Sequence, residues 1–398
     1  MYTPVSQDQL PAPEPDALEQ SALLTRLIRD EIAARDGRIT FARYMECALY
    51  TPGLGYYRAG VRKFGAGGDF ITAPMVSSAF SRSLARQCAQ VLEMTGRGDI
   101  LEFGAGTGRM AADILLELER LDYLPDSYQI LDISTDLRQR QEETLQERAP
   151  HLKSRVRWLQ QTPDEDFKGV ILGNELLDAM PTHRVAIGYE DGPAEIWVEA
   201  TETGFKAVQG PLSDENLVPI INSIRELWQD DVPPHYVTEI NLHALGWIAS
   251  VAQYLSHGAA LLIDYGYPRT EYYHRQRDNG TLMCHYRHRA HENPFLFPGL
   301  QDLTAHVDFS TLAWMGSDNG LDLAGYTTQL NFLINCGIED FVTCIDPKDT
   351  VAMLRMAQEI KTLTMPSEMG ERFKVIAFGR GLSQPLMGFL KHDMRTRL

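Results

Sequence analysis

The sequence predicts an α/β fold built on a parallel β-sheet with helices on both faces. Three observations predict it. Short apolar segments of strand length alternate with segments whose apolar residues recur every three or four positions. One of these strands runs directly into a glycine-rich turn and a helix, and the next strand ends in an acidic residue. Strands and helices that alternate in this way form parallel sheets, because each helix returns the chain to the starting edge.

The expected elements follow this alternation from the N-terminal helix to the last strand. A helix is expected from Ser21 to near Gly37, and residues 50–75 form a long loop region dense in glycine and proline. The expected strands are residues 100–103, 128–133, 156–159, 169–172, 259–263, 321–326 and 373–378. The expected helices that accompany them are residues 80–92, 110–118, 241–256 and 349–363.

Two stretches interrupt the alternation and are interpreted as insertions. Residues 184–235 contain an alternating, hairpin-like segment and then a helical one, and residues 267–305 have little periodicity but many aromatic and histidine residues. The expected domain organisation is a flexible leader over 1–20, an N-terminal helical and lid segment over 21–95, a main domain over 96–382 with both insertions, and a tail over 383–398.

Composition excludes several classes of protein. Of the 398 residues 44% are apolar, which is enough for a large core and excludes wholesale disorder. The 37 Lys and Arg against 54 Asp and Glu give a formal charge of −17, so nucleic acid is an unfavourable partner. No apolar run reaches the roughly 18 residues of a membrane span, so no membrane insertion is expected.

Cysteines and the first residues of the chain bear on its compartment. Five cysteines without a CxxC pair argue against a disulfide framework and favour a reducing compartment. The first 20 residues hold four acidic side chains and no Lys or Arg, unlike a secretory signal or a transit peptide. We therefore expect a cytoplasmic protein.

The glycine-rich turn is the most informative motif. Glu102 lies in the first strand of the sheet, two residues before a GxGxG turn that contains Gly104, Ala105, Gly106 and Gly108 and leads into a helix. Glycines allow a tight turn and let a ligand approach bare backbone at a helix N-terminus. A dinucleotide fingerprint would place its third glycine one residue later, where this chain has arginine. The spacing therefore favours a binding site for S-adenosylmethionine, although a plain tight connection is the alternative.

An acidic residue at the end of the second strand supports this interpretation. Asp132 lies 28 residues after Gly104. A carboxylate at this position accepts hydrogen bonds from both ribose hydroxyls of an adenosine. S-adenosylmethionine contains that diol but no pyrophosphate, so the turn needs to seat only its methionine part.

A second polar cluster follows the fourth expected strand. Asn174, Glu175 and Asp178 come directly after a buried apolar run. In a doubly wound sheet this position borders the crevice at the switch point. Two carboxylates there suit a nitrogen acceptor, because they bind a guanidinium and receive its proton. If the chain turns helical at once, Glu175 and Asp178 share one face; acids that stabilise a helix N-terminus are the alternative.

These motifs occur together in a recognisable order, and the chain resembles the MidA-type methyltransferases. The resemblance extends over roughly residues 20–382. Its segments are GGDFITAP at 67–74, EFGAGTG at 102–108, GNELLDAMP at 173–181, IDYG at 263–266, QDLT at 301–304, VDF at 307–309 and MGERFKVI at 369–376. An acidic residue usually follows the AP pair in this family, and Met75 stands there in this chain.

The resemblance implies a fold and a function. It implies a seven-stranded Rossmann-like sheet that binds S-adenosylmethionine, and transfer of its methyl group to an arginine of a protein substrate. A subunit of respiratory complex I is one candidate substrate, because the mitochondrial member of the family methylates such a subunit. The resemblance also implies that Gly68 and Asp69 belong to a lid over the cofactor, whereas a simple turn is the alternative.

Two other functions and one metal site are alternatives to this interpretation. An assembly chaperone that retains a cofactor pocket would not need both Glu175 and Asp178, and a small-molecule methyltransferase remains an alternative. His285, His288 and His291 have spacing that could suggest zinc, but adjacent arginines oppose a bound cation. We expect no metal there, and the sequence predicts no oligomeric state.

Overall fold

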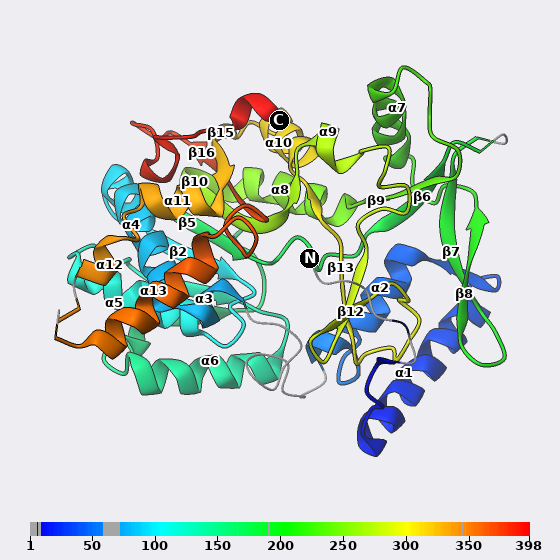
Figure 1. Ribbon diagram of the computed structural model, residues 1–398, viewed down its shortest axis with the longest axis horizontal. Coiled ribbons are helices and arrows are strands. Elements are labelled where there is room, and N and C mark those ends of the chain that lie inside the picture. The colour runs from blue at the N-terminus through cyan, green and yellow to red at the C-terminus, as the bar shows by residue number, and fades with distance from the viewer. Residues whose placement is uncertain are drawn as a thin grey trace. The chain divides into compact units, whose positions relative to one another are not determined.

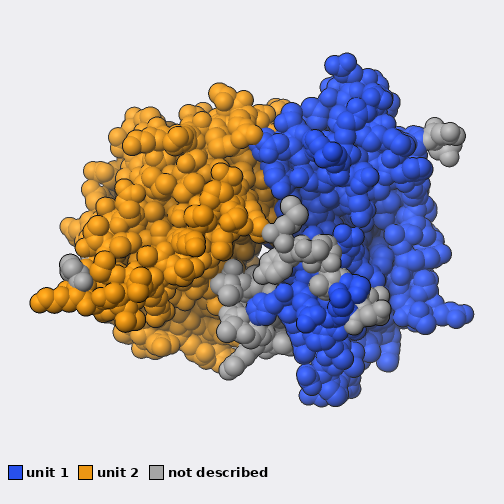
Figure 2. All heavy atoms as spheres, viewed as in Figure 1, with its two compact units in different colours: residues 1–70, 178–246, 267–308 blue, residues 71–177, 247–266, 309–398 orange. Residues whose placement is uncertain are grey.

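The computed structural model describes residues 6, 9–58, 72–164, 166–189, 192–343, 345–346 and 348–398. The chain divides into two compact units (Figure 2). Unit 1 comprises residues 1–70, 178–246 and 267–308, and unit 2 comprises residues 71–177, 247–266 and 309–398.

Unit 2 is built on the predicted parallel sheet, which confirms the α/β fold class (Figure 1). Its strand order is β15-β16-β10-β5-β2-β3-β4, in which β4, β3, β2, β5 and β10 run parallel and β16 is antiparallel to both its neighbours. The strands are β2 (Asp99–Phe103), β3 (Tyr128–Leu131), β4 (Val156–Leu159), β5 (Phe167–Asn174), β10 (Leu255–Tyr267), β15 (Asp322–Thr328) and β16 (Phe373–Arg380).

The register of the sheet brings three strand ends to one edge. Phe103, the last residue of β2, pairs with Leu131 at the end of β3 and with Gly173 near the end of β5. The residues that follow β2, β3 and β5 therefore lie beside one another. This is the edge at which parallel α/β sheets bind their ligands.

Helices cover this sheet through apolar side chains. The core of unit 2 joins Leu84 of α4 and Ile114 of α5 to strand residues such as Ile100 and Val170, all of them buried. The helices are α3 (Ala73–Val76), α4 (Ser78–Thr95), α5 (Arg109–Arg120), α6 (Thr135–Arg148), η3 (Lys153–Arg155), α8 (Leu242–Tyr254), α10 (Phe309–Asp318), α11 (Gln329–Asn335), α12 (Asp340–Thr343), α13 (Thr350–Thr364), η4 (Met387–Phe389) and η5 (Arg395–Arg397).

Unit 1 contains two smaller antiparallel sheets. The order of the first is β1-β7-β6-β9, with β8 paired to β7, and the order of the second is β12-β11-β13. The strands of these sheets are β1 (Arg38–Thr40), β6 (His183–Ile187), β7 (Ala194–Ala200), β8 (Phe205–Gly210), β9 (Tyr236–Ile240), β11 (Met283–Tyr286), β12 (Arg289–His291) and β13 (Asp302–Thr304). The short strand β14 (Val307–Asp308) is part of unit 1 but belongs to neither sheet. The helices are α1 (Pro15–Ala34), α2 (Phe41–Tyr50), η2 (Tyr56–Arg58), α7 (Leu217–Leu227) and α9 (Arg269–Tyr272).

The core of unit 1 is separate from that of unit 2. Leu24 and Ile28 of α1 pack with Tyr44 and Leu49 of α2 and with Leu303 of β13. Helix α1 presents these apolar residues at a spacing of four, so one face is buried. Residues far apart along the chain therefore meet in one small core.

Several elements differ from the sequence-based expectations. Helix α1 begins at Pro15, inside the segment expected to be a leader. The stretches expected as insertions, 184–235 and 267–305, belong to unit 1, and the segment expected over 21–95 divides between the units. Within the described residues no helix has the length and hydrophobicity to cross a membrane.

Candidate active site

The glycine turn after β2 is fixed by its backbone conformation. The Gly104 N–H donates to the Leu131 carbonyl at 3.1 Å, and Gly104 has a φ of 65°. Gly108 begins α5 at a φ of 79°, and a Cβ there would lie 2.9 Å from Cα of Gln141. Glycine is required at position 108 for two reasons: the backbone is left-handed there, and helix α6 approaches it closely.

A buried glutamine joins the turn to the acidic residue after β3. Nε2 of Gln141 donates to the Gly106 carbonyl at 3.1 Å and to Oδ2 of Asp132 at 2.9 Å. Its Oε1 accepts from the Trp158 indole at 2.9 Å, and Oδ1 of Asp132 accepts from the Ser134 N–H at 3.0 Å. Each carboxylate oxygen of Asp132 thus accepts one bond here and has capacity for another.

Burial affects the charge of Asp132. Desolvation raises the pKa of Asp132 above its usual value, while the hydrogen bonds from Ser134 and Gln141 lower it. A diol that donated to this carboxylate would favour the ionised form further. Gln141 carries no signal in the sequence, because it lies in α6, a polar helix without an apolar face.

Glu102 lies in the interior of unit 2 and is only 1% exposed. Its Oε2 accepts from the Tyr128 hydroxyl at 2.7 Å. Desolvation raises the pKa of Glu102 to about 7, although the Tyr128 bond lowers it, and the charge of Asp132 raises it further. Its side chain is therefore placed as an internal partner of Tyr128, and a cofactor contact for Glu102 stays a prediction.

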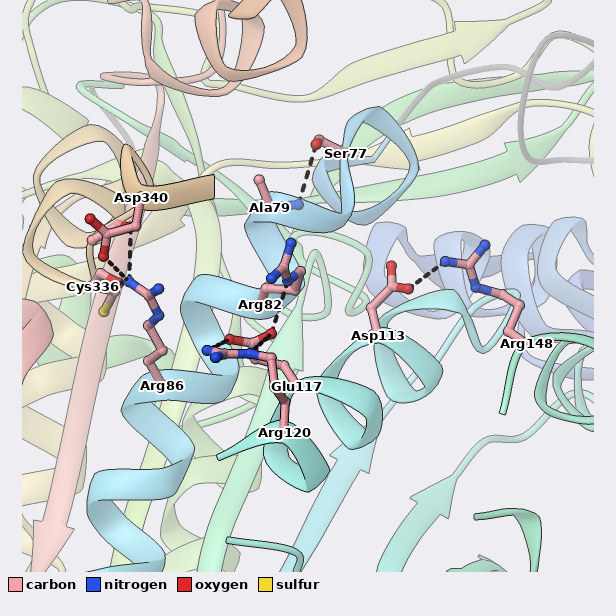
Figure 3. Close-up of polar contacts among 11 residues, drawn as sticks. Ser77, Ala79, Arg82, Arg86, Asp113, Glu117, Arg120, Arg148, Cys336 and Asp340 are labelled. Carbon is pink, nitrogen blue, oxygen red and sulfur yellow. Dashed lines mark hydrogen bonds and ion pairs between the residues drawn. The ribbon is translucent and has the colours of Figure 1, made fainter. Parts of the chain in front are cut away.

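Ion pairs hold helix α5, which follows the glycine turn (Figure 3). The buried Glu117 pairs with Arg82 of α4 at 2.9 Å and with Arg120 at 2.6 Å. Burial raises the pKa of Glu117, but the hydrogen bonds from Arg120 and Arg82 outweigh it and the pKa is lowered. Asp113 pairs with Arg148 of α6 at 2.5 Å. Helix α5 is thereby fixed to the helices on either side.

The chain after β5 takes an unusual backbone conformation. Glu175 has a φ of 50°, in the left-handed region that non-glycine residues rarely occupy. Its N–H donates to the Ile263 carbonyl of β10 at 2.8 Å, and its Oε1 accepts from Nδ2 of Asn174 at 3.1 Å. Oδ1 of Asn174 is buried and has no hydrogen-bond partner among the described residues.

A second carboxylate fixes the rest of this loop. Asp264 is buried; its Oδ2 accepts from the Leu177 N–H and its Oδ1 from the Tyr265 N–H, both at 2.9 Å. The loop after β5 is thus attached to β10 at two points. Such attachment holds a strained residue like Glu175 in place.

No helix follows β5, contrary to one expectation. Residues 175–180 form bends and turns, so Glu175 and Asp178 do not share a helix face. The alternative, that these acids stabilise a helix N-terminus, fails for the same reason. The left-handed φ of Glu175 turns the chain out of the helical path.

Most of the predicted site residues that the structure describes lie in unit 2. Unit 2 brings Gly104, Gly106, Asp132, Asn174 and Glu175 to one sheet edge. The other predicted residues of the turn, Ala105 and Gly108, lie within the same connection.

One predicted residue lies elsewhere, and two are not described. Asp178 belongs to unit 1, where its carbonyl accepts from the Ala305 N–H at 3.0 Å. Gly68 and Asp69, predicted as lid residues, lie outside the described residues. Met75, which replaces the usual acidic residue, lies in α3, and its carbonyl accepts from Arg109 at 3.2 Å.

The chemistry of the unit 2 edge fits S-adenosylmethionine. A Cβ on Gly106 would meet no atom within 4 Å, so there is space beside the turn. Asp132 can accept from a ribose diol, and Oδ1 of Asn174 can accept from an ammonium group. Ile133, which sequence analysis missed, is 48% exposed and offers apolar surface beside Asp132.

The histidine-rich stretch forms a hairpin instead of a loop. His285 lies in β11 and His291 in β12, and Arg287 and His288 form the turn with φ values of 48° and 61°. Burial lowers the pKa of His285 to about 4, and the neighbouring His291 lowers it further. Within the part of the chain that the structure describes, no group of three or more His, Cys, Asp or Glu could hold a metal ion.

The chain is similar to curated proteins over most of its length. It is 29% identical over 374 residues to the protein arginine methyltransferase NDUFAF7 of Danio rerio, and the match covers 85% of this chain and 82% of that protein. The human NDUFAF7 is 29% identical over 373 residues, with 86% and 80% covered.

These relatives correct one expectation. Both are named as mitochondrial proteins, so the prediction of a cytoplasmic protein is wrong. That prediction depended on the lack of a recognisable signal in the first 20 residues. Lack of a signal excludes no compartment.

Solved structures and a family model agree with the geometry of unit 2. A crystal structure from Burkholderia thailandensis that holds S-adenosyl-homocysteine is 46% identical, covers 98% of this chain and 100% of its own, and gives a TM-score of 0.93. A native crystal structure of a protein from the same organism gives 0.90 at the same identity and coverage. The model of the family described as "Putative S-adenosyl-L-methionine-dependent methyltransferase" matches residues 83–327. The chain therefore belongs to this family of S-adenosylmethionine-dependent methyltransferases, with their fold and their cofactor.

Proposed function

We propose that this chain transfers a methyl group to a guanidinium nitrogen of a protein arginine, with Glu175 as the group that acts on the acceptor. One observation carries the proposal. Glu175 is held in a left-handed conformation at the end of β5, beside the glycine turn after β2. Strained residues of this kind cluster at active sites, where the surrounding structure fixes them.

Each residue of the site would have its own role in the reaction. The cofactor, when bound, supplies the methyl group. Asp132 would bind its ribose, the turn over residues 104–108 would seat its methionine part, and Asn174 would orient Glu175 through the 3.1 Å hydrogen bond. The carboxylate of Glu175 would accept hydrogen bonds from the guanidinium and then its proton as the new N–CH3 bond forms.

Asp178 is the second proposed acceptor residue. Its negative charge would favour a cationic acceptor such as a planar guanidinium. The proposed lid contacts of Gly68 and Asp69 and a cofactor contact of Glu102 complete the set.

A protein acceptor is supported by the relatives. Both curated proteins described above are named protein arginine methyltransferases. The family resemblance suggests a subunit of respiratory complex I as the first acceptor to test. Two carboxylates would favour a cationic nitrogen acceptor.

A labelling experiment tests this function. The full chain is incubated with a cell lysate and S-adenosylmethionine labelled in its methyl group, and the labelled protein is hydrolysed to amino acids. We expect labelled methylarginine with the wild type and at least tenfold less with Glu175→Gln. Glu359→Gln, which removes an exposed charge paired with Arg355 at 2.9 Å, is the control that keeps the wild-type level. Label only on lysine, on small molecules or on RNA would overturn the proposal.

A further inference from the structure

Two tyrosines of unit 1 stack beside a buried carboxylate. The rings of Tyr50 and Tyr57 are 5.6 Å apart between centroids, at an interplanar angle of 19°. The Tyr57 hydroxyl donates to Oδ1 of Asp302 at 2.9 Å, and the Tyr50 hydroxyl donates to the Ala179 carbonyl at 2.8 Å. These bonds fix both rings, because each hydroxyl has a defined partner.

The same contacts lead back to Asp178, which completes a closed ring of neighbours. Ala179 is its chain neighbour, and the Ala305 N–H donates to the Asp178 carbonyl at 3.0 Å. Strand β13 carries Asp302 and ends next to Ala305. Asp178 and Asp302 are 5% and 1% exposed, so two buried acidic residues belong to the ring, Asp302 through its carboxylate and Asp178 through its backbone carbonyl.

A buried hydroxyl supports a ligand at this place. Thr304 is two residues after Asp302 in β13, so both side chains lie on the same face of the strand. Thr304 is 3% exposed, and its Oγ1 has no hydrogen-bond partner among the described residues. A buried hydroxyl without a partner costs free energy unless a ligand or water satisfies it.

The charges of both carboxylates are felt at Tyr57. Burial raises the pKa of Tyr57 well above its usual value, and the charges of Asp302, the neighbouring Tyr50 and Asp178 raise it further. Both carboxylates therefore act electrostatically on one phenol. A cation placed at the ring would interact favourably with both.

We propose that Asp302, Tyr50 and Tyr57 form, with Asp178, the guanidinium-binding subsite for the acceptor arginine. This inference rests on the proposed function and names the side chains that recognise the acceptor. A guanidinium is planar, carries five donors and stacks on aromatic faces, so it matches two carboxylates beside stacked tyrosines. The Thr304 hydroxyl would accept one of its remaining N–H groups.

A binding experiment tests the subsite without knowledge of the acceptor protein. The full chain is saturated with S-adenosyl-homocysteine and titrated by calorimetry with N-acetylarginine amide or its citrulline analogue, which is planar but neutral. We expect the arginine compound to bind at least tenfold more tightly. Asp302→Asn should weaken its binding about tenfold, and Tyr57→Phe and Tyr50→Leu severalfold, with the affinity for S-adenosyl-homocysteine unchanged.

Tyr44→Phe is the matched control. It removes another buried hydroxyl of unit 1, which donates to the Pro294 carbonyl at 2.9 Å, and should leave arginine binding unchanged. If Asp302→Asn does not fold by circular dichroism, Tyr57→Phe and Tyr50→Leu decide the result. Equal binding of the arginine and citrulline compounds, or full arginine affinity in the folded variants, would overturn the subsite.

The labelling experiment separates the two proposals. Labelled methylarginine from the wild type, together with an unchanged acceptor KM in Asp302→Asn, would refute the subsite and leave the function intact. If the wild type put no label on arginine, the proposed function itself would be refuted. If Asp302→Asn raised the acceptor KM and left the KM for S-adenosylmethionine nearly unchanged, both proposals would be supported.

Discussion

The glycine-turn edge of unit 2 and the carboxylate–tyrosine ring of unit 1 are assembled from different kinds of parts. At the unit 2 edge, backbone groups and polar residues follow neighbouring strands of one sheet, and their register places them. In unit 1, Tyr50, Tyr57 and Asp302 come from separate stretches and meet through side-chain contacts, and Asp178 is joined to them through backbone groups. The first region should therefore be most sensitive to backbone changes and the second to changes of single polar atoms.

Gly104→Val would break the unit 2 edge most severely. A valine would have to adopt the φ of 65°, and its methyl groups would occupy the space beside the turn. We expect the affinity for S-adenosylmethionine to fall about 10³-fold, measured by calorimetry. Gly204→Val, where a Cβ would meet no atom within 4 Å, is the control that should bind normally. Undiminished affinity in folded Gly104→Val would show that the turn does not seat the cofactor.

Glu102→Gln tests the interior beneath the same edge through pH. Because the folded pKa of Glu102 is raised to about 7 from 4.5, the folded state retains a proton that the unfolded state releases. The contribution of this group to the free energy of unfolding is therefore fully present below pH 4.5, and about 3 kcal/mol of it is lost as the pH rises to 7. The free energy of unfolding is measured in urea at pH 4.5 and pH 8, and it should decrease less between these pH values in the glutamine variant than in the wild type. Equal losses in both proteins would contradict an elevated pKa.

Glu175→Gln and Asp178→Asn sharpen the contrast between the units. Glu175 belongs to unit 2 and is proposed to act on the reacting nitrogen, so its variant should lower kcat about 10²-fold with little change in cofactor affinity. Asp178 belongs to unit 1 and is proposed to bind the guanidinium, so its variant should mainly raise the acceptor KM. If kcat and the acceptor KM changed in the same way in both variants, the two residues would not have different roles. A lower melting temperature with a normal rate of methyl transfer would show that both residues are structural.

Asp132→Ala should have the smallest effect of the four. Loss of hydrogen bonds from a ribose diol to a carboxylate costs about 1.5–3 kcal/mol, which is roughly 10- to 100-fold in cofactor affinity. Gln141→Leu, which removes the 2.9 Å hydrogen bond to Asp132, should reproduce part of this loss. Wild-type affinity in Asp132→Ala would place the ribose contact elsewhere.

The sequence predicted the parts of the site that are local in the chain. The glycine turn, Asp132, Asn174 and Glu175 are each a few letters next to an apolar strand, so their position at the sheet edge followed from strand order, whereas Asp178 lies in unit 1. It did not predict the conformation of Glu175, because hydrogen bonding to Ile263 in a distant strand overrides the local tendency to form a helix. Gln141 and Tyr57 gave no signal, since their roles depend on partners far along the chain.

The chain passes between the two units five times, at residues 70, 177, 246, 266 and 308. Neither unit is therefore a continuous stretch that could fold while the other is still being synthesised on the ribosome. Strand β16, which lies near the C-terminus, pairs with β10 in the middle of the sheet of unit 2. Until residues 373–380 have been synthesised, the edge of β10 that pairs with β16 is exposed, and an exposed strand edge favours aggregation.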